Sequence, residues 1–104
     1  MADNVLRIGI AGLGTVGSAV VNILEDRRAD ISAITGKHIE VVAVSARDKS
    51  KKRNINLQKC EWVDDPRALA RRDDIDVVVE VMGGDGDPAL ATVRLALERG
   101  KAVV

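Results

Sequence analysis

The chain has 104 residues, of which 46% are apolar and 31% charged, a composition typical of one folded domain. Lysine plus arginine and aspartate plus glutamate number 16 each, so the formal net charge is zero, and Trp62 is the single aromatic residue. Proteins that bind nucleic acids or anionic membranes are usually basic, and single-strand binders need aromatic platforms. We therefore expect neither a nucleic-acid nor a membrane partner.

The cysteine count and the N-terminus indicate the cellular compartment of the protein. Cys60 is the only cysteine, so no internal disulfide can form, as is usual in a reducing compartment. The N-terminus lacks the basic and apolar regions of a signal peptide, and no apolar run approaches the ~20 residues of a membrane helix. The sequence predicts a cytoplasmic protein.

The first half of the chain predicts strands separated by a helix and a loop. Residues 5–11 are almost all apolar and predict a strand. The next apolar residues recur at helical spacing and predict a long helix that ends at Gly36, with a break expected near residues 29–30. The apolar residues of this pattern are Val16, Ala19, Val20, Ile23, Leu24, Ile31 and Ile34. Residues 39–45 predict the second strand, 48–58 a polar, basic loop, and 59–63 a short third strand.

The second half repeats the alternation. Asp65 and Pro66 are typical of a helix start, and this helix is expected to reach about residue 72. Residues 75–82 predict a strand buried on both faces. Residues 87–88 repeat the Asp-Pro start, after which one helix face carries Leu90, Val93 and Leu97, and Gly100 ends the helix.

Residues 101–104 predict the beginning of a fifth strand, so we expect the chain to be the N-terminal domain of a longer protein. Strands that alternate with helices predict an α/β fold with a doubly wound parallel sheet. The expected strand order is 3-2-1-4-5, truncated at the fifth strand.

The main motif is a glycine fingerprint of the form G-x-G-x-x-G, which comprises Gly12, Leu13, Gly14, Thr15, Val16 and Gly17. It closes an apolar strand and opens an amphipathic helix, the context in which this pattern binds a dinucleotide. The first glycine permits a tight turn, the second lets a pyrophosphate approach the backbone, and the third lets helix and strand pack closely. The motif predicts a Rossmann-type NAD(P)-binding domain over residues 1–104. The alternative is a turn in which the glycines serve geometry alone.

The end of the second strand bears on the choice of cofactor. An acid there usually binds the ribose of NAD, whereas an arginine accommodates the 2′-phosphate of NADP. Here Ser45 stands at the acid position and Arg47 follows, with a basic run behind it. These residues favour NADP, although Asp48 leaves NAD possible, and a solvated basic loop is the alternative.

A second glycine-rich loop follows the strand at 75–82 and contains Met82, Gly83 and Gly84. With the expected strand order, this loop lies beside the first glycine loop at the carboxyl edge of the sheet, where α/β proteins bind ligands. The alternative is a plain turn into the helix start at Asp87.

For the other candidate residues, the sequence favours structural roles. Glu80 lies within an apolar strand, where we expect it to pair with a nearby arginine. His38 is expected to be structural or exposed, and Cys60 to be a small core residue. No metal-ligand spacing and no Ser-His-Asp arrangement is evident.

Five segments together resemble the cofactor-binding domain of bacterial homoserine dehydrogenases: LRIGIAGLGTVGSAVV, IEVVAVSARDKSK, CEWVDDPRALA, DIDVVVEVMGG and ALERGKAVV. The resemblance implies an oxidoreductase that interconverts L-homoserine and L-aspartate 4-semialdehyde with NAD(P), on the route to threonine, methionine and isoleucine. It further implies a homodimer in the intact enzyme.

By the same resemblance, residues 13–16 would contact the pyrophosphate, Arg47 the 2′-phosphate, and Gly83 and Gly84 the nicotinamide ribose. In the family, a Thr-Ala-Asn-Lys segment follows the fifth strand, and the catalytic lysines and substrate-binding acids lie in it and beyond it; this sequence lacks that segment. We therefore assign no catalytic residue here, and this piece alone is expected to be inactive. The alternatives are the first domain of another dehydrogenase, of aspartate or aspartate-semialdehyde type, and a nucleotide-sensing domain that is not an enzyme.

Overall fold

The structure is a computed structural model that describes residues 4–51, 53, 55–57, 59–83 and 86–104. Within these residues, five strands form one parallel sheet in the order β3-β2-β1-β4-β5, which confirms the predicted topology. The elements in chain order are β1 (Val5–Ala11), α1 (Thr15–Asp26), α2 (Arg28–Thr35), β2 (His38–Ser45), β3 (Glu61–Trp62), α3 (Pro66–Arg71), β4 (Val77–Glu80), α4 (Ala89–Glu98) and β5 (Ala102–Val103).

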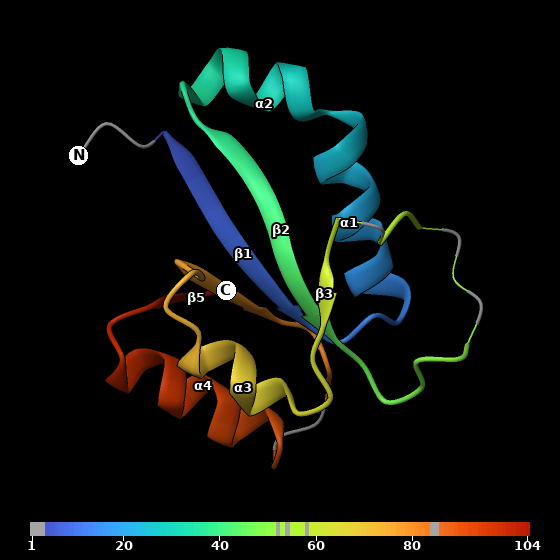
Figure 1. Ribbon diagram of the computed structural model, residues 1–104, viewed down its shortest axis with the longest axis vertical. Coiled ribbons are helices and arrows are strands. Elements are labelled where there is room, and N and C mark those ends of the chain that lie inside the picture. Colours follow the sequence, from blue (N-terminus) through green and yellow to red (C-terminus); the bar gives the residue numbers. More distant parts are fainter. Residues whose placement is uncertain (1–3, 52, 54, 58, 84–85) are drawn as a thin grey trace.

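The helices cover the two faces of the sheet in pairs (Figure 1): α1 and α2 lie on one side of the strands, α3 and α4 on the other. Each face has its own apolar cluster because neighbouring strand residues point to opposite sides. Ile10 faces α1 together with Val21, whereas Ala11 faces the other cluster with Leu69 and Ala96.

The central strands are buried on both faces, as the apolar run at 75–82 predicts. Val78 and Val79 are both buried. The strand is shorter than predicted because the Met82 N–H turns to the Glu80 carboxylate at 2.7 Å. β3 is likewise shorter, since the Cys60 N–H closes a turn onto the Leu57 carbonyl at 3.1 Å.

The long first helix is broken as expected, but at Arg27, slightly before the predicted residues 29–30. Arg27 separates α1 from α2, and Gly36 ends α2 with a φ of 73°. The ion pair between Arg27 Nε and Asp30 Oδ2, at 2.9 Å, accompanies this break. Gly36 therefore ends the second helix as predicted, and the expected break is present, although its position differs slightly from the predicted one.

The two Asp-Pro starts differ from one another. Asp65 caps α3 as predicted and accepts a hydrogen bond from the Arg67 N–H at 2.9 Å, with Pro66 as the first helical residue. In α4, by contrast, Pro88 is the cap and Ala89 the first helical residue. The Asp87 carboxylate nevertheless accepts a hydrogen bond from the Ala91 N–H at 3.1 Å.

The packed face of α4 differs from the apolar face seen in the sequence. Leu90 and Leu97, two residues of that apolar face, are 48% and 59% exposed, so this is not the side on which the helix packs. The buried residues are small, namely Ala89, Thr92 and Ala96. Small side chains let a helix approach its neighbours closely, and the hydroxyl of Thr92 donates to the Pro88 carbonyl at 2.8 Å.

Strand β2 contains an irregularity opposite the middle of β1. Ile8 pairs with Val41, but Gly9 pairs with Ala43, so Val42 is an additional residue in β2. Such a bulge leaves the additional residue unpaired and disrupts the ladder locally. Beyond it, the pairing continues to the last residues of both strands.

Candidate functional site

The carboxyl ends of three strands align in one row. Ala11 at the end of β1 pairs with Ser45 of β2 on one side and with Glu80 of β4 on the other. The three segments singled out in the sequence begin directly after these residues. Their predicted convergence on one edge of the sheet is therefore confirmed for the described residues.

The glycine loop has the geometry that its spacing predicts. Gly12 has a φ of +105°, which L side chains rarely adopt, and a Cβ there would lie 2.8 Å from the Val81 carbonyl oxygen. A Cβ on Gly17 would lie 1.9 Å from the Gly12 carbonyl oxygen. Gly14 differs from both, because a Cβ at this position would meet no atom within 4 Å. Two glycines thus serve packing, and the third faces open space.

The open space at Gly14 lies at the N-terminus of α1. Gly14 is the cap residue, no side chain caps the helix, and the first turn contains no acidic residue. Thr15 and Val16 in that turn are exposed. Backbone N–H groups at such a terminus attract an anion. Leu13 is different: its side chain is buried in the core, so only its backbone is available near the site.

The end of β2 is tied directly to the glycine loop. The Gly12 N–H donates to the Ser45 carbonyl at 2.7 Å, and Ser45 itself is buried. Arg47, two residues later, is exposed. Ser45 is thus withdrawn from the open edge, and the exposed guanidinium is the first side chain of this segment that can reach a ligand in solvent.

Asp48, the residue that leaves NAD possible, is engaged locally. Its Oδ1 accepts hydrogen bonds from the Ser50 hydroxyl at 2.6 Å and from the Ser50 N–H at 3.0 Å. The hydrogen bond from the Ser50 side chain is the main reason that the pKa of Asp48 is lowered. The carboxylate therefore stabilises a turn within the basic loop.

Arg53 and Trp62 are two residues of this region that sequence reasoning did not single out. Arg53 Nε donates to the Leu13 carbonyl at 3.2 Å, and Nη1 donates to the Asp48 carbonyl at 2.7 Å. The Arg53 guanidinium also lies 5.6 Å from the centroid of the Trp62 ring, over which Lys49 Nζ lies at 5.9 Å. No motif signals the contact between Arg53 and Leu13, because these residues are 40 positions apart in the sequence.

The loop after β4 completes the row. The Glu80 carboxylate accepts a hydrogen bond from the Met82 N–H at 2.7 Å, so the structure gives it a backbone partner where an arginine was expected. Gly83 has a φ of +83°, and a Cβ there would meet nothing within 4 Å. Gly84, predicted to lie near the cofactor, is outside the described residues.

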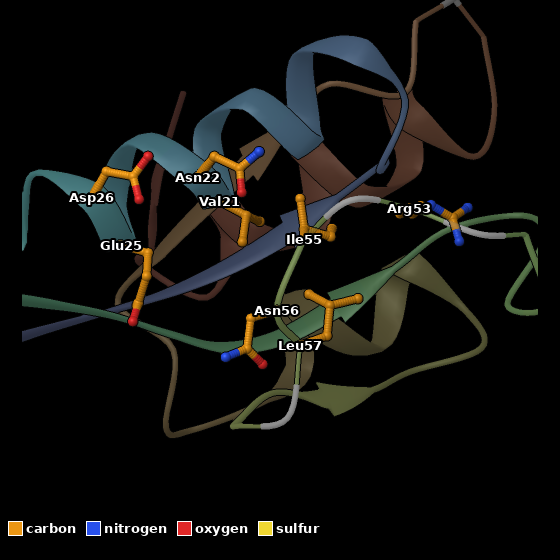
Figure 2. Close-up of a pocket in the computed structure, with 8 residues that line it drawn as sticks. All are labelled: Val21, Asn22, Glu25, Asp26, Arg53, Ile55, Asn56 and Leu57. Carbon is orange, nitrogen blue, oxygen red and sulfur yellow. The ribbon is translucent and has the colours of Figure 1, made fainter.

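An open cavity of about 540 Å³ lies beside this edge. Figure 2 shows it between α1 and the segment before β3, with Arg53 at one end and Glu25 and Asp26 at the other. Its lining residue Arg53 donates to the Leu13 carbonyl of the glycine loop, but its two acids disfavour a phosphate. We therefore assign the predicted site to the strand-end row and the α1 terminus, outside this cavity.

The remaining candidates lie away from the row. His38 is exposed at the start of β2. The Cys60 thiol is half-buried and donates to the Val41 carbonyl at 3.2 Å, and burial is the main reason that its pKa is raised. Among the described residues, no group of three His, Cys, Asp or Glu side chains could hold a metal ion.

Comparison with known proteins shows the family of this chain. The family model described as homoserine dehydrogenase, NAD binding domain, matches residues 12–104, from the first glycine of the fingerprint to the last residue. The chain belongs to this family. A domain of the homoserine dehydrogenase family that binds a nicotinamide cofactor accounts for the fold and for the glycine loop together.

Individual relatives agree with the family. Homoserine dehydrogenases of Neisseria gonorrhoeae and Mycobacterium tuberculosis are 38% and 37% identical over 95% and 93% of this chain. The solved structure of S. aureus homoserine dehydrogenase has a TM-score of 0.86 at 40% identity and is covered over 26% of its length, against 97% of this chain. The structure from Thiobacillus denitrificans has a TM-score of 0.85 at 30% identity, over 95% of this chain and 22% of that one.

The chain spans about a fifth of the curated relatives, namely 22% and 21% of the two sequences above. It corresponds to their cofactor-binding part. Among the described helices, none has both the length and the apolar character needed to cross a membrane.

Proposed function

We propose that this chain forms the dinucleotide site of a homoserine dehydrogenase and prefers NADP(H) to NAD(H). In the whole protein this site serves the interconversion of L-homoserine and L-aspartate 4-semialdehyde. We further propose that the whole protein is a cytoplasmic, homodimeric enzyme of threonine, methionine and isoleucine biosynthesis. The bound nicotinamide ring would exchange the hydride with the substrate; this chain's own residues bind and orient the cofactor.

The observation that carries the proposal is the open space over Gly14 at an uncapped helix terminus. A loop in which glycine serves geometry alone has no need of a glycine whose Cβ would touch nothing. A pyrophosphate needs this space, because it must approach the backbone N–H groups closely. The fit therefore favours a ligand over a purely structural turn.

Preference for NADP(H) is supported by the residues at the end of β2. Ser45 is buried and the Asp48 carboxylate bonds to Ser50, whereas Arg47 is exposed next to the strand-end row. A guanidinium matches a phosphate through paired hydrogen bonds. On the other side of the row, Met82, Gly83 and Gly84 would lie near the nicotinamide ribose, with Glu80 shaping the loop.

Calorimetric titration with NADPH and with NADH, at low salt, tests the proposal. Gly14→Ala should weaken both cofactors by about tenfold or more while the thermal midpoint stays close to the unmodified value, because the new methyl group occupies the pyrophosphate space. Arg47→Ala should weaken NADPH by about 10–100-fold and NADH little, the effect of losing a charged hydrogen bond. Arg94→Ala, an exposed arginine on α4, is the matched control.

Two results would count against the proposal. Unchanged affinity in Gly14→Ala would mean that the ligand does not approach this glycine. Equal losses of NADPH and NADH in Arg47→Ala would remove Arg47 from the 2′-phosphate role.

A further inference from the structure

We propose that Arg53 is a positioning residue that fastens the Arg47 segment to the glycine loop and thereby sets the preference for a dinucleotide with a 2′-phosphate. This inference rests on the proposed function of the site. Arg53 acts through the placement of Arg47, and no direct contact between Arg53 and the cofactor is required.

Two connections, each made of hydrogen bonds, join the segment that contains Arg47 to the glycine loop; we call them the two ties. Its first end is Ser45, whose carbonyl accepts the Gly12 N–H at 2.7 Å. Its other end is Asp48, whose carbonyl accepts Arg53 Nη1 at 2.7 Å. Because Arg53 Nε also donates to the Leu13 carbonyl at 3.2 Å, both ends of a four-residue span are joined to the glycine loop.

The two ties differ in what they depend on. The Gly12–Ser45 bond joins backbone to backbone, so no side-chain substitution in this segment removes it directly. The second tie depends wholly on the Arg53 side chain. Without it, the hydrogen bonds between described residues would leave the segment after Ala46 joined to the glycine loop only through the chain itself, and Arg47 would sample more positions.

The shape of the guanidinium explains why an arginine suits this place. One planar group donates in two directions, to Leu13 through Nε and to Asp48 and Lys51 through Nη1. A lysine ammonium is a point charge without this fixed fork. The guanidinium also lies over the Trp62 ring, which limits its movement from the side of β3.

An ordered Arg47 side chain should increase the affinity for NADPH more than the affinity for NADH. A side chain that is ordered before binding loses less conformational entropy when it meets the phosphate. NADH has no phosphate at that position, so its affinity is insensitive to how well Arg47 is placed. The ratio of the two affinities therefore separates a positioning role from a general contribution to stability.

The test compares Arg53→Lys with the unmodified chain and with the matched control Arg94→Lys. Arg53→Lys keeps the positive charge, so long-range attraction of phosphate is preserved while the fork is lost. We expect the Kd for NADPH to rise about tenfold and the Kd for NADH to change less than about twofold. Hydrogen exchange of residues 46–51, measured without cofactor, should become faster in Arg53→Lys and remain unchanged in Arg94→Lys.

Trp62 fluorescence provides an independent measurement of the Arg53 contact, because Trp62 is the only tryptophan of the chain. Its emission should change in Arg53→Lys before any cofactor is added. Circular dichroism of the same sample shows whether the variant is folded, and a second variant, Arg53→Gln, serves if the first is not.

Each outcome decides the matter. Selective loss of NADPH affinity with faster exchange over residues 46–51 supports the inference. Equal losses for the two cofactors, unchanged affinities, or unchanged exchange would overturn it. If the unmodified chain binds neither cofactor, the proposed function itself fails, and the role of Arg53 in specificity falls with it.

Discussion

Replacing Gly17 by alanine tests the packing of the glycine loop independently of any ligand. The new Cβ would lie 1.9 Å from the Gly12 carbonyl oxygen and 3.2 Å from a methyl group of Val81. Contact distances between nonbonded heavy atoms require the loop to move by about 1 Å. Gly12 has little freedom to yield, because its φ is +105° and its own Cβ position faces the Val81 backbone.

The expected loss of stability combines three contributions. Overpacking of this kind costs about 1–3 kcal/mol. Movement of Gly12 strains its hydrogen bond to the Ser45 carbonyl, which contributes about 1 kcal/mol. The better helix propensity of alanine offsets up to about 1 kcal/mol. The net destabilisation is therefore about 2 kcal/mol.

Urea unfolding, followed by Trp62 fluorescence and far-UV circular dichroism, measures this quantity. With an m value of about 1–2 kcal/mol per M, the midpoint should fall by about 1–2 M. Gly14→Ala is the matched control, since its Cβ meets nothing, and should stay within about 0.5 kcal/mol of the unmodified chain. A midpoint for Gly17→Ala within about 0.3 M of the control would refute the packing argument.

Three further predictions follow from the described contacts. Asp65→Ala should cost about 1 kcal/mol in urea unfolding, because the Arg67 N–H loses its acceptor, and Asp65→Asn should cost less. Hydrogen bonds, chiefly from the Ser50, Arg67 and Arg72 side chains, lower the pKa values of Asp48, Asp65 and Asp74, respectively. Since these carboxylates stabilise the fold above about pH 4, the urea midpoint should fall as the pH decreases through the lowered values, and a rising midpoint would contradict this. Burial raises the pKa of Cys60, so iodoacetamide at pH 7.5 should alkylate it at least about tenfold more slowly than in the unfolded chain, as mass spectrometry would show.

The order of the strands followed from the sequence because apolar strands and amphipathic helices alternate and crossovers are right-handed. That order alone brings the ends of β1, β2 and β4 together, so the three loops of the site could be predicted to meet. The individual roles of Gly12 and Gly17 were also predictable, since each follows from the geometry of a tight strand–helix turn.

Side-chain contacts between distant residues were beyond such reasoning. Arg53 reaches the Leu13 carbonyl across 40 positions of the chain, and within the sequence it is one member of a basic run. The packed face of α4 could not be read from the apolar pattern either, for a different reason. Periodicity selects the largest apolar residues, but close approach to the sheet and to α3 selects small ones such as Ala96.

The bulge in β2 has a consequence for the tolerance of this domain to changes in length. Val42 is the additional residue, and the register of β2 against β1 shifts by one residue across it. Loss of one residue at the bulge would regularise the ladder and leave Ser45 opposite Ala11. Loss of one residue after the bulge would move Val42 into the place of the fully buried Ala43, so the pairing would be kept but the core would have to accommodate a larger side chain. The bulge thus gives β2 one residue more than the pairing requires. A deletion before Ser45 can therefore leave Ser45 paired with Ala11, and the segment that carries Arg47 in place.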